Sequence, residues 1–483
     1  MPRINLCRPQ PGQEPVADQI RQRRHPRDLL HLDAALLNNP SVAAGWNSLL
    51  GAIRSENSLP DDLRELLILR VAALNSAPYE WIAHEKVGRA AGLTTLQLLR
   101  IRDVVKPLEI RLDAKTQNYL TSLHIAGIKF ADNVTRSLLV TNHQLDQFKH
   151  ELTSLKTDFD IDRMVLDATA TVAGYNMVSR VLITLDVADD HNQSVPIPGL
   201  EAKVESFLMS DGTKLTARCQ KTTDSQVSRP WLMFCNSLLT DMTMWDWITP
   251  SLAANYNLVC FDQRGHGRSS VPTSPCTINQ LADDIAEIVR QLDIPTPLHG
   301  LIGVSQGGAT ALAVCTRHPQ LFNHYIVCDT QPRSPPGNRK AWEARIQLAQ
   351  SATDGMRQLS EATVERWFPS ESHLNLTNHP VAAAVKQMIQ RTSIPGFRAG
   401  ANALYDYVID ENLIGTGQQK VLLVAGSQDG SLPKVLEELS QRLKQKDKPI
   451  EFASVPGSGH LPMIDQPLKF INIIEAFLGG YAF

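Results

Sequence analysis

The fold of the longer half of this chain is decided by residues 298–309, LHGLIGVSQGGA. An apolar strand, 298–304, runs into a Gly-x-Ser-x-Gly turn centred on Ser305, and a helix-like run follows over 309–317. This is the context of a nucleophile elbow, in which the serine sits on a sharp turn above a sheet and flanking glycines let neighbouring backbone pass close by. Taken alone the motif is weak, because average residue usage gives on the order of 0.1 chance matches in a chain of this length. A simple Gly-Ser turn is the alternative.

Short β-rich runs alternate with helical ones on both sides of this stretch. The runs are 204–209, 231–235, 257–261, 325–328, 421–425 and 451–455. Strands interleaved with helices indicate a parallel α/β sheet. We therefore expect an α/β-hydrolase domain.

The order of serine, acid and histidine supports that expectation. Asp429 follows the run 421–425, and His460 follows the run 451–455. In this arrangement His460 removes the proton from Ser305, while Asp429 fixes the imidazole tautomer and stabilises the imidazolium. Asp329, which ends the run 325–328 near the same sheet edge, is the rival acid.

Two loops complete the expected site. Residues 236–245, NSLLTDMTMW, follow a strand at the place where this fold supplies one oxyanion donor, and the second comes from the residue after the nucleophile. We assign the backbone N–H groups of Leu238 and Gln306. The polar loop 261–269, FDQRGHGRS, is expected to brace the site, with Asp262 and His266 in structural roles.

The first half of the chain has a different pattern. From about residue 33 to 187, Gly and Pro are few and apolar residues recur at steps of three and four, which predicts an all-α domain. A polar and then proline-rich stretch separates it from the strands. The expected organisation is a helical domain over 1–190, a linker over 191–200, and an α/β-hydrolase domain over 201–483 with a helical lid at about 331–418.

Three polar residues stand out in the helical half. Glu80 and His84 lie four residues apart and share a helix face, and Glu65 from the preceding helix could complete an acid–base cluster. Spacing alone favours a solvated face of glutamate and histidine.

Composition narrows the possible partners. With 47 Lys and Arg against 50 Asp and Glu, the net charge is -3, and no basic block exists to bind nucleic acid or an anionic membrane.

The seven cysteines are an odd number without a C-x-x-C pair, so neither a disulfide framework nor a zinc site is expected. We expect no metal and no cofactor. The sequence has no signal-peptide pattern and no run of 18 apolar residues, so the cytoplasm is the expected location.

From about residue 200 to 483 the motifs resemble those of 3-oxoadipate enol-lactone hydrolases. They are NSLLTDMTMW, DQRGHGRS, GVSQGG and GHLPMIDQP. The stretch ERWFP, 365–369, is similar to the lid motif of that family, which implies that Arg366 and Trp367 face a substrate carboxylate. A helix-surface arginine beside a core tryptophan is the alternative.

From about residue 33 to 187 the chain resembles the carboxymuconolactone decarboxylase and alkylhydroperoxidase D-like family. The motifs are Glu65-x11-Ala77-x2-Glu80-x3-His84, then GRAAGLT at 88–94 and GYNMVSR at 174–180. In the peroxidase branch the positions of Ala77 and Glu80 are a C-x-x-C pair, so disulfide-based peroxide reduction is excluded. The resemblance implies a decarboxylase-like cleft lined by Glu65, Glu80 and His84, and a homo-oligomer assembled through this domain.

The two resemblances describe consecutive steps, decarboxylation of γ-carboxymuconolactone and hydrolysis of the resulting enol-lactone. We therefore expect a serine hydrolase of a small-molecule lactone or enol ester, joined to a decarboxylase-like domain. The familiar bifunctional fusion has the hydrolase first, whereas here it comes second. The alternative is a hydrolase or lactonase of a specialised-metabolite pathway whose helical domain serves only for oligomerisation.

Overall fold

The computed structural model describes residues 2–106, 120–188, 193–351, 353–375 and 379–479. Parts of the expected linker (191–192) and of the expected lid (352 and 376–378) lie outside these residues. The chain divides into two compact units, Met1–Pro198 and Gly199–Phe483.

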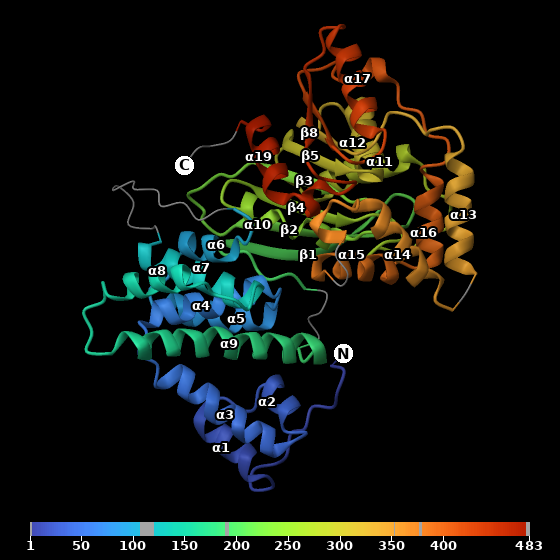
Figure 1. Ribbon diagram of the computed structural model, residues 1–483. Coiled ribbons are helices and arrows are strands. Elements are labelled where there is room, and N and C mark those ends of the chain that lie inside the picture. Colours follow the sequence, from blue (N-terminus) through green and yellow to red (C-terminus); the bar gives the residue numbers. More distant parts are fainter. Residues whose placement is uncertain (1, 107–119, 189–192, 352, 376–378, 480–483) are drawn as a thin grey trace. The chain divides into compact units, whose positions relative to one another are not determined.

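The first unit is built from helices (Figure 1). They are α1 (Pro15–Arg24), α2 (His31–Leu36), α3 (Pro40–Ser55), α4 (Asp61–Leu74), α5 (Pro78–Ala90), α6 (Thr95–Arg102), α7 (Ser122–Arg136), α8 (Asn142–Leu152) and α9 (Ile161–Leu185). Helix α4 is the centre of the unit, because it is buried from Glu65 to Ala73 and packs against α5, α7 and α9. A helix that is apolar around most of its circumference must be enclosed in this way.

The second unit is a mixed eight-stranded sheet in the order β1-β2-β4-β3-β5-β6-β7-β8. The strands are β1 (Leu200–Leu208), β2 (Lys214–Thr222), β3 (Trp231–Cys235), β4 (Asn257–Asp262), β5 (Leu298–Val304), β6 (Phe322–Cys328), β7 (Lys420–Gly426) and β8 (Ile450–Val455). Strands β3 to β8 are parallel, as predicted.

The other edge of the sheet differs from the prediction. Strands β1 and β2 are antiparallel, and the sequence analysis missed β2 altogether. Residues 214–220, KLTARCQ, do alternate polar and apolar side chains as a strand does, but the polar members Thr216, Arg218 and Gln220 are buried too, so the segment lacks the apolar run by which the other strands were recognised.

Helices cover the sheet, and a separate group of helices lies between β6 and β7 in the sequence (Figure 1). The covering helices are α10 (Thr249–Leu252), α11 (Ile278–Gln291), α12 (Gln306–Arg317), α17 (Leu432–Lys444), α18 (Pro462–Asp465) and α19 (Pro467–Phe477). The inserted group, the lid, consists of α13 (Asn338–Gln350), α14 (Gly355–Trp367), α15 (Pro380–Arg391) and α16 (Ile394–Asn402). Among the described helices, none is long and apolar enough to cross a membrane.

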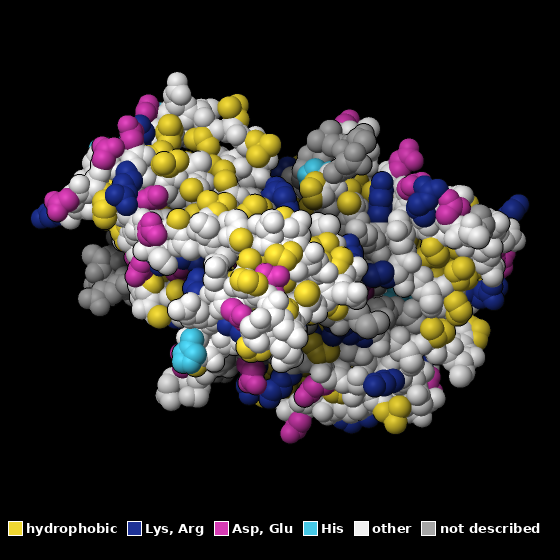
Figure 2. Space-filling view, turned by 90° about the horizontal axis from the view of Figure 1, so that it is seen from below, with side chains coloured by type: hydrophobic (Ala, Val, Ile, Leu, Met, Phe, Trp, Pro, Cys, Tyr) yellow, Lys and Arg dark blue, Asp and Glu magenta, His cyan; other side chains and the backbone are white. Residues whose placement is uncertain are grey.

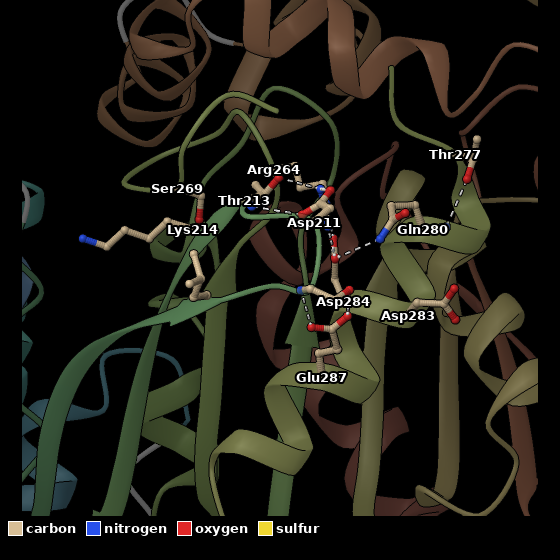
Figure 3. Close-up of polar contacts among 12 residues, drawn as sticks. Asp211, Thr213, Lys214, Arg264, Ser269, Thr277, Gln280, Asp283, Asp284 and Glu287 are labelled. Atoms are coloured by element: carbon tan, nitrogen blue, oxygen red, sulfur yellow. Dashed lines mark hydrogen bonds and ion pairs between the residues drawn. The ribbon is translucent and has the colours of Figure 1, made fainter. Parts of the chain in front are cut away.

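A buried arginine fixes the polar loop that follows β4. The Arg264 guanidinium lies between Asp284 of α11 and Asp211, with Nε 2.5 Å from Asp284 Oδ2 (Figure 3). Arg264 also donates to the Thr213 hydroxyl at 2.8 Å. These bonds tie the loop to the turn between β1 and β2.

On the face shown in Figure 2, Lys and Arg side chains are interspersed with Asp and Glu.

Candidate active site

Ser305 occupies the sharp turn between β5 and α12. Its backbone is strained, with φ 58° and ψ -118°. A Cβ on Gly303 would lie 2.2 Å from the Gly307 carbonyl oxygen, and a Cβ on Gly307 would lie 2.2 Å from that of Cys235. Neither position tolerates a side chain, so the two glycines allow the turn that the motif predicted.

His460 and Asp429 meet at the same end of the sheet. The two side chains form a bond of 2.6 Å between His460 Nδ1 and Asp429 Oδ2. Although burial opposes ionisation of Asp429, His460 outweighs it and the pKa of Asp429 is lowered. Among the described contacts, Ser305 Oγ makes no hydrogen bond to His460. Nucleophile and base often tighten only when substrate binds.

Trp367 holds the histidine from the lid side. Its backbone carbonyl oxygen accepts the backbone N–H of His460 at 2.9 Å, and its ring stacks on the imidazole with centroids 5.7 Å apart. Trp367 is buried. The tryptophan therefore contacts the predicted base directly, a contact that the sequence did not indicate.

Of the two assigned oxyanion donors, Leu238 lies on the loop after β3 and Gln306 is the first residue of α12. Among the described residues, the backbone N–H groups of Leu238 and Gln306 donate no hydrogen bond. The next amide, that of Leu239, donates to His266 Nε2 at 3.1 Å, while His266 Nδ1 lies 2.9 Å from the Arg264 carbonyl oxygen. Burial lowers the pKa of His266 to about 4, which keeps its ring neutral.

Asp262 braces the same region. It accepts the backbone N–H groups of Met242 and Arg268 at 2.7 and 2.8 Å. Burial, aided by Asp241, raises its pKa to about 7. These contacts agree with the structural roles expected for Asp262 and His266.

Asp329, the rival acid, lies beside Asp429 and has an unusual environment. It follows β6 with φ 47°, and its Oδ1 accepts the Gly426 N–H at 2.8 Å. Its Oδ2 is buried and accepts no hydrogen bond from any described residue. Burial, and then the charge of Asp429, raises the pKa of Asp329 well above its ordinary value. A protonated Asp329 can donate a hydrogen bond, which an ionised one cannot.

The lid brings two guanidinium groups near this site. Arg366 lies in the last turn of α14, and Arg345 on α13 lies close enough to affect its ionisation. Neither makes an ion pair or hydrogen bond among the described residues. Desolvation by the surrounding protein, and then the positive charge of Arg345, lowers the pKa of Arg366 to about 10. The negative charge of Asp429 acts in the opposite direction. The sequence analysis did not single out Arg345.

In the helical unit, Glu65, Glu80 and His84 lie in one buried cluster. His84 Nδ1 lies 2.8 Å from Glu65 Oε2, and the edge of the ring meets Tyr175 at 4.9 Å between centroids. Glu80 does not bond to His84; its Oε2 accepts the Ser179 hydroxyl at 2.8 Å. Glu65 and Glu80 are each only 2% exposed, so the prediction from spacing alone that they lie on a solvated helix face is wrong.

Burial controls the protonation of this cluster. It raises the pKa of Glu80 well above the ordinary value and lowers that of His84. The second carboxyl oxygen of Glu80 has no partner among the described residues. The sequence analysis quoted Tyr175 and Ser179 within a motif but gave them no role; their spacing of four on α9 is the signal that places them together.

Comparison with known proteins adds family relationships to this geometry. Residues 230–467 match the family model described as the alpha/beta hydrolase fold. The C-terminal unit has the α/β-hydrolase fold. Residues 40–108 match the model of the carboxymuconolactone decarboxylase family.

Relatives and solved structures match the hydrolase half. The 3-oxoadipate enol-lactonase 2 of Acinetobacter baylyi is 29% identical over 53% of this chain and 91% of its own length. The 3-oxoadipate enol-lactonase 1 of that organism is 28% identical over 55% and 96%. An enol-lactonase from Burkholderia xenovorans superposes with a TM-score of 0.50 at 25% identity, over 57% of this chain and all of the other. A hydrolase from Pseudomonas aeruginosa, at 24% identity and a TM-score of 0.51, shares the fold over 58% of this chain and 99% of its own.

We expect the stability of Asp329→Asn to exceed that of the wild type increasingly as pH rises. Because the folded-state pKa of Asp329 is raised, its neutral form favours folding at low pH, and this advantage is lost between about pH 4 and the folded pKa. Each pH unit in that interval costs the wild type about 1.4 kcal/mol, and an amide escapes this cost. Urea unfolding across pH 5 to 8 measures the difference.

Asp283→Asn is the control with the opposite sign. Although partial burial of Asp283 opposes its ionisation, His318 and Arg317 outweigh it and lower the pKa of this carboxyl. That variant loses stability relative to the wild type as pH rises through the acid range. A stability difference for Asp329→Asn that does not change with pH would mean that Asp329 is ionised in the folded protein.

Proposed function

We propose that the α/β-hydrolase unit is a serine hydrolase that opens a lactone or enol ester. The observation that carries this proposal is the strained elbow of Ser305 at the sheet edge where His460 and Asp429 form a bond of 2.6 Å. Ser305 is the nucleophile, His460 the general base and then acid, and Asp429 the carboxylate that orients the ring.

The reaction has two halves. Ser305 Oγ attacks the substrate carbonyl while His460 takes its proton, and the oxyanion forms against the N–H groups of Leu238 and Gln306. The ring C–O bond then breaks, and the leaving oxygen takes the proton from His460. In a lactone this oxygen stays attached to the acyl chain. Water, deprotonated by His460, then attacks the acyl-enzyme. The bond between the acyl carbon and Ser305 Oγ breaks, Oγ takes the proton from His460, and the free acid leaves.

Asp329 completes the acid side of this arrangement as a positioning residue. In this role a neutral Asp329, whose Oδ2 has no other partner among the described residues, donates a hydrogen bond to the neighbouring Asp429 carboxylate. This bond stabilises ionised Asp429 and restricts its rotation, so that one oxygen stays directed at His460 Nδ1. In this proposal Asp429 is the triad acid and Asp329 supports it.

The lid favours an anionic substrate. Arg366 and Arg345 present guanidinium groups that have no carboxylate partner among the described residues, and a guanidinium pairs well with a carboxylate. Trp367 packs on His460 and serves that residue, while Arg366 serves the substrate. The named relatives make 3-oxoadipate enol-lactone the first substrate to test. A lactone from a specialised-metabolite pathway is the alternative.

The helical unit supports a second candidate function, decarboxylation without a cofactor. The observation that favours it is Glu80, a buried carboxyl group with a raised pKa in a unit that matches the decarboxylase family. A substrate with a vinylogous lactone carbonyl can accept the electron pair left by CO2, and the neutral acid then delivers a proton to carbon. Assembly of the chain into a homo-oligomer through this unit is the rival role.

Ser305→Ala should lose about 10⁴-fold or more in kcat for any ester or lactone that the wild type hydrolyses, because removing a triad member leaves only the oxyanion hole and binding. Hydrolysis of 3-oxoadipate enol-lactone and of neutral esters is followed spectrophotometrically. Near wild-type rates in this variant would contradict the serine mechanism.

Arg366→Ala should raise KM for a carboxylate-bearing lactone by roughly 10-fold or more, since a charge-assisted hydrogen bond is lost. The neutral methyl ester of the same lactone should lose far less. Arg357→Ala on the same helix is the matched control, because Arg357 is paired with Asp354 and Glu361 instead. Equal losses for the acid and its ester would remove carboxylate recognition from Arg366.

Glu80→Gln should abolish CO2 release from γ-carboxymuconolactone while leaving ester hydrolysis unchanged, because an amide cannot deliver the proton. Release of CO2 is measured together with lactone loss, in the full chain. No release by the wild type, or unchanged release by the variant, would contradict decarboxylation at this site. The oligomeric state from light scattering tests the rival role.

A further inference from the structure

Helices α1, α2 and α3 enclose a narrow pocket in the helical unit. The polar side chains that line it are those of Arg23, Arg24, Asp33, Asn47 and Arg54. Helices α1 and α2 precede residues 40–108, where the family match lies. The wall that carries Arg23 and Arg24 is therefore outside the matched family region.

The charges around this pocket do not balance. Three arginines line it, and the single acid, Asp33, is bound by Arg24 at 2.6 Å between Nε and Oδ2. Arg54 donates instead to the hydroxyl of Tyr175 at 2.7 Å. Burial raises the pKa of that phenol to about 12, so it remains neutral. Among the described residues, Arg23 and Arg54 have no carboxylate partner.

Two further observations support an anion-binding role. Partial burial, and then the positive charges of Arg24 and Arg54, lowers the pKa of Arg23 against the opposing effect of Asp33. The Asn47 side-chain oxygen is buried and has no hydrogen-bond partner among the described residues. A half-turn of the Asn47 amide exchanges its oxygen and nitrogen and presents an NH2 donor to an oxyanion.

We propose that this pocket binds a small oxyanion, the carboxylate or phosphate group of a small molecule, through Arg23, Asn47 and Arg54. Guanidinium groups suit both, because their parallel N–H bonds match two oxygens of a planar or tetrahedral anion. Arg24 and Asp33 form the rigid pair beside the site.

The pocket ends next to the buried acid–base cluster. Arg54 holds the Tyr175 hydroxyl, and the Tyr175 ring meets the edge of His84. An oxyanion on Arg54 therefore lies one side chain away from the cluster of Glu65, Glu80 and His84. The binding site stands on its own observations and holds whether or not the cluster catalyses decarboxylation.

Isothermal titration calorimetry of the full chain tests the site. Inorganic phosphate is the ligand in one titration and acetate in the other, and chloride keeps the ionic strength constant. We expect saturable binding of at least one of the two anions. Phosphate alone would identify a phosphate group, and acetate alone a carboxylate. Arg54→Gln should weaken that binding by about 10-fold or more, as loss of a charge-assisted contact does.

Two variants distinguish binding in this pocket from a folding defect and from binding elsewhere on the chain. Tyr175→Phe removes the bond to Arg54 but keeps the guanidinium, so this variant should still bind the anion and shows the effect of losing that bond alone. Arg27→Gln alters an exposed arginine that does not line the pocket, and it should bind like the wild type. Binding of neither anion, or equal weakening by Arg54→Gln and Arg27→Gln, would overturn the proposal.

Discussion

The hydrolase unit depends on how closely its backbone packs where β5 turns into α12. Gly303 and Gly307 let the elbow approach the end of β3, and the Ser305 N–H is held by the Cys328 carbonyl oxygen of β6 at 2.9 Å. One strained residue is thus fixed by strands on both sides. Strain of this kind costs roughly 1–3 kcal/mol and persists only where the surroundings enforce it. Because β6 takes part, the residue that follows it, Asp329, is carried to the same edge.

Each unit contains a buried carboxyl group with one oxygen that lacks a partner among the described residues. Asp329 lies close enough to Asp429 for the charge of Asp429 to raise its pKa, and Glu80 accepts the Ser179 hydroxyl. An unpartnered buried polar atom costs about 1–3 kcal/mol, and no packing advantage of a carboxyl over an apolar side chain offsets that cost. Both groups have raised pKa values and are therefore neutral acids. A neutral acid can donate a hydrogen bond or a proton, and this gives a functional reason for both residues.

Sequence patterns predicted those features that depend on local order along the chain. The strands β3 and β5 have the expected bounds, and the serine, acid and histidine follow their strands as the motif requires. What the sequence could not give are contacts between distant segments. Trp367 against His460, Asp329 against Asp429 and Arg54 against Tyr175 each join residues with no shared periodicity or spacing. Burial of Glu65 and Glu80 was missed for the same reason, since a helix face shows its polarity but not what covers it.

The first turn of α5 shows how position and burial together set the chemistry of the helical unit. Ala77 caps this helix and Glu80 lies in its first turn, where the positive end of the helix dipole stabilises an anion by at most about 2 kcal/mol. At these positions a pair of thiols would gain reactivity from the same dipole, because thiolates form more readily there. For Glu80 the dipole is outweighed by complete burial, and its carboxyl stays protonated. Because this helix end has no thiols and its carboxylic acid is neutral, the chemistry left to it is donation of a proton. Arg23 of α1 and Arg54 of α3 have no carboxylate partner among the described residues, so their positive charges can bind an anionic ligand near this helix end.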